Sequence, residues 1–303
     1  MILQVEILSF CGISRTTMQI PYAKHLEASV TLLGRNRLEA SAFLESLRSR
    51  PLSHTFYGDC RDTVVLVTEG AGSVATFMTS PPSEDNKEKL ILLLQNALKN
   101  TAQKGIATAH ALLGEDDLFL AHLFKVAAFT ELATLCYMEW RAHANQSDIA
   151  QTTNANFCAI SACTDNDFEK ILKETYIGSL DCPAIHGKRD IKDIIQSHQG
   201  FGANDLSLWF TILLDQEPAG VLLLNKPKNE QYFELAYLGI SPRMRKKGLA
   251  EEAMDYAINQ ATRRGCNKII LAVDASNTPA IRLYKKAHFR ETVKRIAMFC
   301  PLR

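Results

Sequence analysis

The sequence lacks a hydrophobic run long enough to cross a bilayer. A membrane-spanning helix needs about 20 consecutive apolar residues, whereas the apolar runs at 90–94 and 221–224 have the length of core segments. The amino terminus, MILQVEILSFCGIS, has no basic residue ahead of its apolar stretch and carries Glu6 inside it, which is typical of a strand rather than a signal peptide. We therefore expect a cytoplasmic protein without a membrane partner.

An excess of charge of either sign is also missing. The 34 Lys and Arg residues against 33 Asp and Glu residues leave a formal net charge of +1. Such a chain has no global basic field to attract nucleic acid, so we expect no nucleic-acid partner. The 47% of hydrophobic and 22% of charged residues are ordinary for a globular protein and exclude a disordered chain. Any site for an anion must be local.

The eight cysteines form no CxxC pair and no Cys/His pattern with the spacing of metal ligands. This absence argues against structural zinc and against a disulfide scaffold. We expect reduced, mostly buried thiols and no metal cofactor.

The length of 303 residues favours two domains. A polar stretch at 141–156 separates two apolar segments, and we place the linker there, between a first domain at 1–145 and a second at 155–303. Periodicity in the second half predicts interleaved strands and helices. The expected strands are 157–162, 207–214, 219–225, 232–240, 268–273 and 291–299, and the expected helices are one that opens at Asp165 or Asn166 and those at 190–197, 247–264 and 278–287.

The two halves of the chain are similar to each other. Residues 101–129 align without a gap on residues 261–289, an offset of 160, with Gly105 on Gly265 and Phe129 on Phe289. Both segments contain a helix end, a glycine, a strand, a turn and a second helix in the same order. We infer a duplication, in which strands at 63–68 and 73–79 and a helix at 86–103 mirror elements of the second half.

The strongest local signal is a basic turn between the expected strand 232–240 and the helix 247–264. Gly248 lets the backbone approach a ligand closely, and four cations at 243 and 245–247 precede it. The first N–H groups of a helix are unpaired and attract anions. The turn therefore favours a pyrophosphate site, and a solvated basic turn is the alternative.

Residues 157–300 resemble the GNAT superfamily of N-acetyltransferases in two motifs. The segment RKKGLA at 245–250 is similar to the loop Q/R-x-x-G-x-G/A, and NTPAIRLYKKAHF at 277–289 is similar to N-x-x-A-x-x-L-Y-x-x-x-G-F, with His288 where Gly is usual. The resemblance implies an α/β fold with a mixed, mostly antiparallel sheet flanked by helices. With the duplication, it implies two tandem acyl-CoA N-acyltransferase-like domains, an architecture similar to mycothiol synthase. The departure at His288 bears on the turn after the helix more than on catalysis.

The resemblance also implies acetyl-CoA as cosubstrate, in a gap between the strands 232–240 and 268–273. In this family pattern, backbone groups of one strand bind the pantetheine arm, the loop holds the pyrophosphate, and an Asn contacts the arm. The amide near Leu238 would also stabilise the negative charge that develops on the thioester oxygen. The implied cofactor-binding residues are Leu238, Gly239, Ile240, Arg245, Lys246, Lys247, Gly248, Leu249, Ala250 and Asn277.

Two residues are candidates for proton transfer. Tyr284 matches the tyrosine of the second motif, and a phenol is protonated at neutral pH, so it can give its proton to the leaving sulfur. Glu234, in ELAYLGIS, is the candidate general base, because it resembles the EIVFCAIS arrangement of the histone-acetylating branch. A core aromatic and a solvated strand carboxylate are the respective alternatives.

Four further residues, Asp181, Cys182, His186 and Arg189, lie in a segment that lines the acceptor pocket in this family. Taken one by one, each is typical of a loop or packing residue. Trp209 on an expected strand is interpreted as core or pocket wall.

The first half lacks this machinery. At the offset of 160, Tyr284 corresponds to Phe124 and Asn277 to Asp117, and the loop corresponds to SEDNKEKL at 83–90, which has no glycine and three acids. Like charges would repel a phosphate. We therefore expect a degenerate GNAT-like domain that serves packing, shapes the acceptor pocket, or forms a homodimer.

The sequence thus predicts an N-acetyltransferase that moves acetyl from acetyl-CoA to a primary amine of a small molecule or peptide, by direct attack in a ternary complex. A catalytically silent acyl-CoA-binding regulator or scaffold is the alternative. Acetylation of protein amino termini would require an open acceptor groove.

Overall fold

The structure is a computed structural model that describes residues 19–50, 52–142, 154–162, 164–200, 205–227 and 231–303. The strand expected at the amino terminus and most of the expected linker lie outside the described residues. Within them, no helix combines the length and the apolar character that crossing a bilayer requires. Of the described cysteines, Cys136, Cys266 and Cys300 are buried as expected, whereas Cys60 and two others are partly exposed, and all are free thiols.

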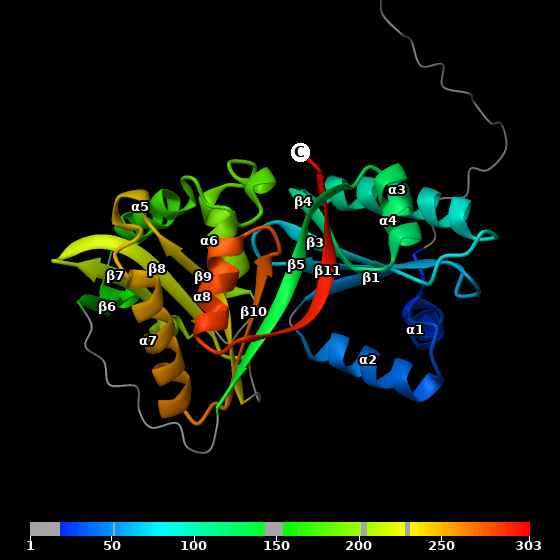
Figure 1. The fold of residues 1–303 in the computed structure, drawn as a ribbon. Coiled ribbons are helices and arrows are strands. Elements are labelled where there is room, and N and C mark those ends of the chain that lie inside the picture. The colour runs from blue at the N-terminus through cyan, green and yellow to red at the C-terminus, as the bar shows by residue number, and fades with distance from the viewer. Residues whose placement is uncertain (1–18, 51, 143–153, 163, 201–204, 228–230) are drawn as a thin grey trace, which may run out of the picture.

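One mixed sheet of 11 strands runs through the whole molecule (Figure 1), in the order β1-β2-β3-β4-β11-β5-β10-β9-β8-β7-β6. The strands of the first half are β1 (Ser53–Gly58), β2 (Val64–Gly70), β3 (Val74–Thr79), β4 (Thr108–Gly114) and β5 (Thr130–Arg141). Those of the second half are β6 (Ala155–Ala159), β7 (Trp209–Leu214), β8 (Glu217–Asn225), β9 (Tyr232–Ile240), β10 (Lys268–Asp274) and β11 (Arg290–Pro301). Neighbouring strands are antiparallel except at β3–β4 and β9–β10.

The helices cover both faces of this sheet. In the first half they are α1 (His25–Leu33), α2 (Arg37–Ser49), α3 (Lys87–Gln103) and α4 (Leu118–Val126); in the second half they are α5 (Asp165–Tyr176), α6 (Ile191–Gln199), α7 (Leu249–Arg263) and α8 (Thr278–Lys286). Short 3₁₀ helices lie at Tyr22–Lys24, Ile160–Ala162, Pro183–Ile185, Leu206–Leu208 and Pro242–Met244. The expected strand at 157–162 therefore begins earlier and ends at Ala159, where the chain turns into a 3₁₀ helix.

Each half has three layers because side chains alternate along its strands. On β8, Leu222 and Leu224 pack with α7 and α8, whereas Val221 and Leu223 pack with α5 and α6. In the first half β2 divides its side chains in the same way between α3 with α4 and α1 with α2.

The two halves repeat the same order of elements, as the sequence comparison predicts. β4, α4 and β5 correspond to β10, α8 and β11 with both ends of each element at the offset of 160. The backbone at the matched pair Ala128 and His288 has φ of 87° and 65°, in the left-handed region. The turn after α8 therefore keeps its geometry although a histidine stands where glycine is usual.

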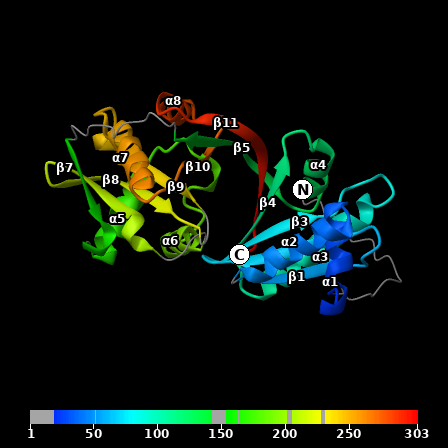
Figure 2. The same ribbon diagram turned by 90° about the horizontal axis from the view of Figure 1, so that it is seen from below.

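The halves exchange their last strands. β5 pairs with β10 of the second half, and β11 pairs with β4 of the first, while β5 and β11 also pair with each other. Figures 1 and 2 show these two strands side by side between the halves. Consequently Met138 and Trp140 belong to the core of the second half, and Ile296 and Met298 to the core of the first. The expected boundary near residue 150 separates segments of the chain, but the hydrophobic cores cross it.

Candidate functional site

The parallel strands β9 and β10 diverge in the second half. Tyr232–Glu234 pair with Lys268–Ile270, and beyond this point β9 keeps its pairing with β8 up to Ile240. The β8–β9 register shifts between Leu223 and Leu224, and such a bulge increases the local twist of a strand. The divergence therefore leaves one edge of Leu238, Gly239 and Ile240 facing a gap, where the sequence predicts the cofactor arm.

Close packing explains the glycine in this segment. A Cβ at Gly239 would lie 2.6 Å from the Tyr237 hydroxyl and 2.7 Å from Cβ of Thr175. The Tyr237 hydroxyl also shares a 2.9 Å hydrogen bond with Oγ1 of Thr175. Gly239 thus lets the Tyr237 ring fold back along its own strand towards α5.

The basic turn after β9 leads directly into α7. Lys246 has φ of 64° and Gly248 has φ of 83°, and α7 begins at Leu249. No atom lies within 4 Å of the position that a Cβ at Gly248 would take. The first N–H groups of α7 are unpaired by helix geometry, so the turn presents donors beside open space. This arrangement fits a phosphate.

The four cations of the turn have different surroundings. Nε and Nη1 of Arg243 lie 3.3 Å and 3.5 Å from carboxylate oxygens of Glu174 and Glu217. Lys246 and Lys247 are exposed. The two lysines are the cations that remain available to a ligand.

Arg245 is committed to the protein itself. Its guanidinium donates to the carbonyls of Ile240 (3.0 Å), Gly178 (3.1 Å), Thr175 (3.1 Å) and Ile177 (2.7 Å). Three of these carbonyls lie at the carboxyl end of α5 or just after it, where orphan carbonyls and the helix dipole favour a cation. Arg245 therefore fixes the turn against α5, and its contribution to cofactor binding would come from the backbone.

A buried hydroxyl marks the entrance of the turn. Ser241 is fully buried, and its Oγ has no hydrogen-bond partner among the described residues. Because an unpaired buried hydroxyl destabilises a fold by about 1–3 kcal/mol, this atom is a plausible partner for a ligand held in the turn.

Tyr284 lies on α8, which Asn277 caps by accepting a hydrogen bond from the Ala280 N–H at 3.3 Å. The Tyr284 side chain is 8% exposed and packs against Phe289, with ring centroids 5.9 Å apart. Within the described part of the chain its hydroxyl makes no hydrogen bond. Burial, followed by the nearby Asp181 and Tyr237, raises the pKa of this phenol. Tyr284 therefore stays protonated at neutral pH.

The segment between α5 and α6 reaches the same place. Oδ1 of Asp181 accepts a 2.9 Å hydrogen bond from the Asp274 N–H at the end of β10, and Oδ2 of Asp274 accepts one from the Cys182 N–H at 3.2 Å. Nε2 of His186 lies 2.9 Å from the Asp181 carbonyl. Three of the residues that the sequence treats as ordinary loop residues are thus tied to the open end of the β9–β10 gap.

Glu234 lies elsewhere on β9. It is opposite Ile270, where β9 and β10 are still paired, four residues or about 13 Å along the strand from Leu238. Burial raises the pKa of Glu234, and its charge acts on Tyr137, which the first half contributes through β5. The predicted acid and the predicted base therefore have different neighbours.

Two other residues singled out from the sequence serve packing. Trp209 is 1% exposed, and its Nε1 donates to Oδ1 of Asn225 at 3.1 Å, which confirms a core role. Nη2 of Arg189 donates to the Gly72 carbonyl and to Oγ of Ser197, at 3.4 Å and 2.9 Å. Arg189 thus joins the β2–β3 hairpin of the first half to α6 of the second.

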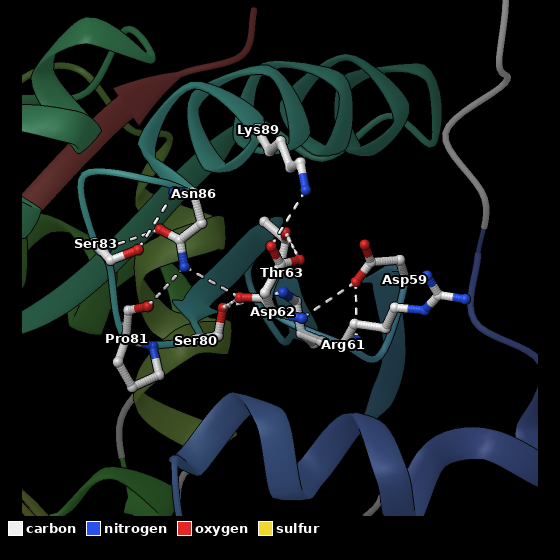
Figure 3. Close-up of polar contacts among 10 residues, drawn as sticks. Asp59, Arg61, Asp62, Thr63, Ser80, Pro81, Ser83, Asn86 and Lys89 are labelled. Carbon is white, nitrogen blue, oxygen red and sulfur yellow. Dashed lines mark hydrogen bonds and ion pairs between the residues drawn. The ribbon is translucent and has the colours of Figure 1, made fainter.

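The corresponding turn of the first half is filled by its own side chains (Figure 3). Oδ1 of Asn86 accepts from the Ser83 N–H at 2.8 Å, and its Nδ2 donates to the carbonyls of Asp62 and Pro81 at 3.2 Å and 3.1 Å. Nζ of Lys89 contacts the Asp62 carboxylate at 3.2 Å. The polar groups that would face a phosphate already have partners.

The strand beside that turn is also regular. β2 and β3 pair from Val65 with Thr79 to Gly70 with Val74 without a register shift. The counterpart of Tyr284 is Phe124, which is fully buried and carries no proton to donate.

Comparison with known proteins agrees with this geometry. Residues 166–289 match the model of the acetyltransferase (GNAT) family. A search of curated proteins gave no match.

Among solved structures, a GCN5-related N-acetyltransferase from Sphaerobacter thermophilus is similar with a TM-score of 0.62 and 13% identity, over 93% of this chain and 91% of that one. A tandem GNAT protein from the clavulanic acid biosynthesis pathway has a TM-score of 0.55 and 11% identity, over 93% and 96% of the two chains. A GCN5-related N-acetyltransferase from Kribbella flavida has a TM-score of 0.50 and 14% identity, over 88% and 95%. At these identities the likeness concerns the fold. Residues 166–289 therefore match the GNAT acetyltransferase family, and the chain as a whole has a fold similar to that of a tandem GNAT protein.

Proposed function

We propose that the protein is an acetyl-CoA-dependent N-acetyltransferase whose second half transfers acetyl to a primary amine by direct attack. The observation that carries the proposal is the junction of three features: the gap between β9 and β10, the open turn at Gly248, and the unbonded hydroxyl of Tyr284. The packing of the core does not by itself require these three features to occur together.

Acetyl-CoA would be held along the gap. The free edge of Leu238–Ile240 offers strand-like hydrogen bonds to the pantetheine arm, and the N–H groups of residues 246–250 offer donors to the pyrophosphate. Lys246 and Lys247 add positive charge there, while Arg245 holds the turn in place. The bound thioester supplies the activated acetyl group.

Tyr284 would act as the general acid in this reaction. Its raised pKa keeps the phenol protonated, and a proton donor is needed where the sulfur leaves as a thiolate. The amine must be neutral before it attacks, so a second group has to take its proton. Glu234 is the sequence-based candidate for that role.

We propose a structural role for the first half. It contributes β5 to the core of the second half, and with it Tyr137, on which the charge of Glu234 acts from across β10. Its own turn is closed by Asn86, which argues against a second cofactor site there.

The test is thermal unfolding with and without acetyl-CoA, on the wild type and on Gly248→Glu. A ligand at about 100 times its dissociation constant adds about 2.7 kcal/mol to the free energy of unfolding. We expect this stabilisation in the wild type and its loss in Gly248→Glu, because the new carboxylate would occupy the open space and repel phosphate.

Gly265→Glu is the matched control. Gly265 follows the same helix, has φ of 70°, and also has no atom within 4 Å of a Cβ. It shares the backbone strain and the added charge, but it should keep the response to acetyl-CoA. Equal responses in both variants would contradict the site at 246–250. Stabilisation without release of CoA in the presence of any primary amine would favour the silent acyl-CoA-binding regulator.

A further inference from the structure

Asp181 is a largely buried carboxylate without a basic partner. Among the described residues no Lys or Arg forms an ion pair with it, and Nε2 of His186 contacts its backbone carbonyl instead. Burial without a counter-ion disfavours the charged form and raises the pKa of Asp181. A carboxylate in such a place is stabilised by a ligand that brings a positive charge.

The position of this carboxylate is fixed by three separate elements. Oδ1 accepts from the Asp274 N–H on β10 at 2.9 Å, and Asn277 at the start of α8 contacts the same carboxylate. The following residue, Cys182, has φ of 45° and donates its N–H back to Asp274. The loop is thus held in a strained conformation that keeps Asp181 at the open end of the β9–β10 gap.

The Asp181 and Glu234 carboxylates differ in the tyrosines on which their charges act. The Asp181 charge acts on both Tyr284 and Tyr237, and the Glu234 charge acts on Tyr137. The Tyr284 side chain is more than nine-tenths buried, and its hydroxyl oxygen, which can accept a hydrogen bond, receives none from the described residues. A primary ammonium group, with three donors and one positive charge, has the chemistry that this space lacks.

We infer that Asp181 binds the ammonium group of the acceptor and removes its proton before the attack on acetyl-CoA. The inference rests on the proposed function and names the general base of the same site. It makes the acceptor an amine that is a cation in solution.

The protons balance as follows. One proton passes from the ammonium to the Asp181 carboxylate, and the neutral amine then forms the C–N bond with the acetyl carbon. As the C–S bond breaks, the sulfur takes the Tyr284 proton. The second proton of the nitrogen restores Tyr284, and Asp181 releases its proton to solvent. The products are the amide, CoA with a free thiol and one proton.

The groups that face Asp181 set the direction of its titration. They are Asp274 on β10, Asn277 and Tyr284 at α8, Tyr237 on β9, Tyr176 on α5, and His186 in its own loop. Burial is the largest influence and raises the pKa, followed by the Asp274 N–H, which lowers it. A raised pKa brings a carboxylic acid closer to the value at which a general base is efficient near neutral pH.

The experiment compares Asp181→Asn, Glu234→Gln and the wild type with two acceptors. One is the primary alkyl amine that the wild type acetylates fastest, as judged by CoA release, and the other is hydroxylamine, which is already neutral at pH 7. We expect Asp181→Asn to lower kcat/KM for the alkyl amine by about 10²–10⁴-fold and for hydroxylamine by less than about tenfold, since that nucleophile needs no base. The acidic limb that Asp181 gives to the pH profile with the alkyl amine should disappear in the variant.

Stability separates this role from a structural one. A carboxylate with a raised pKa contributes stability in its protonated form, and that stability is lost as pH rises through the folded pKa. Asp181→Asn should therefore unfold at the same or a higher temperature at pH 7 and keep its stabilisation by acetyl-CoA. Asp165→Asn, an exposed site on α5, removes the same charge and should change none of these quantities.

Equal losses for both acceptors, or the selective loss in Glu234→Gln instead, would overturn the assignment while leaving the acetyltransferase standing. A wild type that binds no acetyl-CoA, or that acetylates no amine, would overturn the proposed function and Asp181 with it.

Discussion

The turns at 80–90 and 241–250 occupy the same place in the two halves, but they differ in whether their polar groups have hydrogen-bond partners within the described part of the protein. Ser80 and Ser241 each follow a matched strand, and the N–H of each donates to a carbonyl of the neighbouring strand. Oγ of Ser80 accepts from the Val64 N–H and donates to the Asp62 carbonyl, whereas Oγ of Ser241 has no partner among the described residues. A fold can therefore be kept while a site closes, because closure needs partners for only a few donors and acceptors.

The contrast extends to the strands and helices beside the turns. The register between β8 and β9 shifts at Leu223/Leu224, whereas the matched strands β2 and β3 pair without a shift. The parallel pair β3–β4 nevertheless ends after three residue pairs, as β9–β10 does. Tyr284 presents an unbonded hydroxyl at the position where Phe124 fills the first core with carbon alone. The proposed activity therefore depends on polar groups of the second half that have no hydrogen-bond partner within the described residues.

The largest effect is expected when the hydroxyl of Tyr284 in the second half is removed. Tyr284→Phe should lower kcat by about 10²–10⁴-fold, because the leaving sulfur loses its proton donor. Binding of acetyl-CoA, measured by thermal shift, should be largely unchanged. Tyr256→Phe removes a hydroxyl from α7, where the ring centroid lies 4.1 Å from that of Phe157, and should keep full activity.

A hydroxyl added at the matched position of the first half tests whether that half can act as an active site. Phe124→Tyr in the Tyr284→Phe background should restore no turnover, because the first half has no open turn beside it. Unchanged activity in Tyr284→Phe alone would dismiss Tyr284 as the acid.

The exchanged strands predict that the two halves unfold together. Met138 and Met298 are buried in the core opposite to their own half, so Met138→Ala and Met298→Ala should each destabilise the protein by about 2–5 kcal/mol. Urea unfolding followed by fluorescence and circular dichroism should show one shared transition in both variants. Met78→Ala, at a side chain 41% exposed, should change stability by less than about 0.5 kcal/mol. Two separate transitions, of which each variant shifts one, would show that the two halves unfold independently and would contradict the prediction.

The smallest expected effect concerns two largely buried histidines, one in each half. Burial, and then Arg189, lowers the pKa of His110 on β4 and of His198 on α6 to about 4. A histidine with a lowered folded pKa contributes stability above the unfolded value of 6.5, and that stability is lost as pH falls towards 4. Each contributes at most about 3 kcal/mol.

His110→Phe and His198→Phe should therefore flatten the fall in urea midpoint between pH 6.5 and pH 4, with similar sizes in the two halves. The exposed His122→Gln should leave the curve as it is. An unchanged slope in both Phe variants would mean that acid destabilisation comes from other groups.

The order of elements, the repeat and the loop could be predicted from the sequence because each depends on local patterns. The strand at 232–240 and the offset of 160 are recovered residue by residue. Glycine at 248 carries its own signal, since few other residues adopt its φ. The sequence could not separate the roles of the four cations, because whether Arg245 meets a phosphate or the end of α5 depends on a helix some 70 residues earlier.

Local sequence patterns are enough to show that this chain has two similar halves and that the second half has the glycine-containing basic turn and a tyrosine at 284. The exchange of β5 and β11 between the halves could be seen only in the folded chain, because either strand would satisfy the hydrogen bonds at the edge of either half. The fold also brings the charge of Asp181 to act on Tyr284, which the sequence could not predict because a loop residue has no periodicity that indicates its neighbours. Contacts between distant segments depend on how the helices and strands pack, and local sequence patterns do not predict that packing.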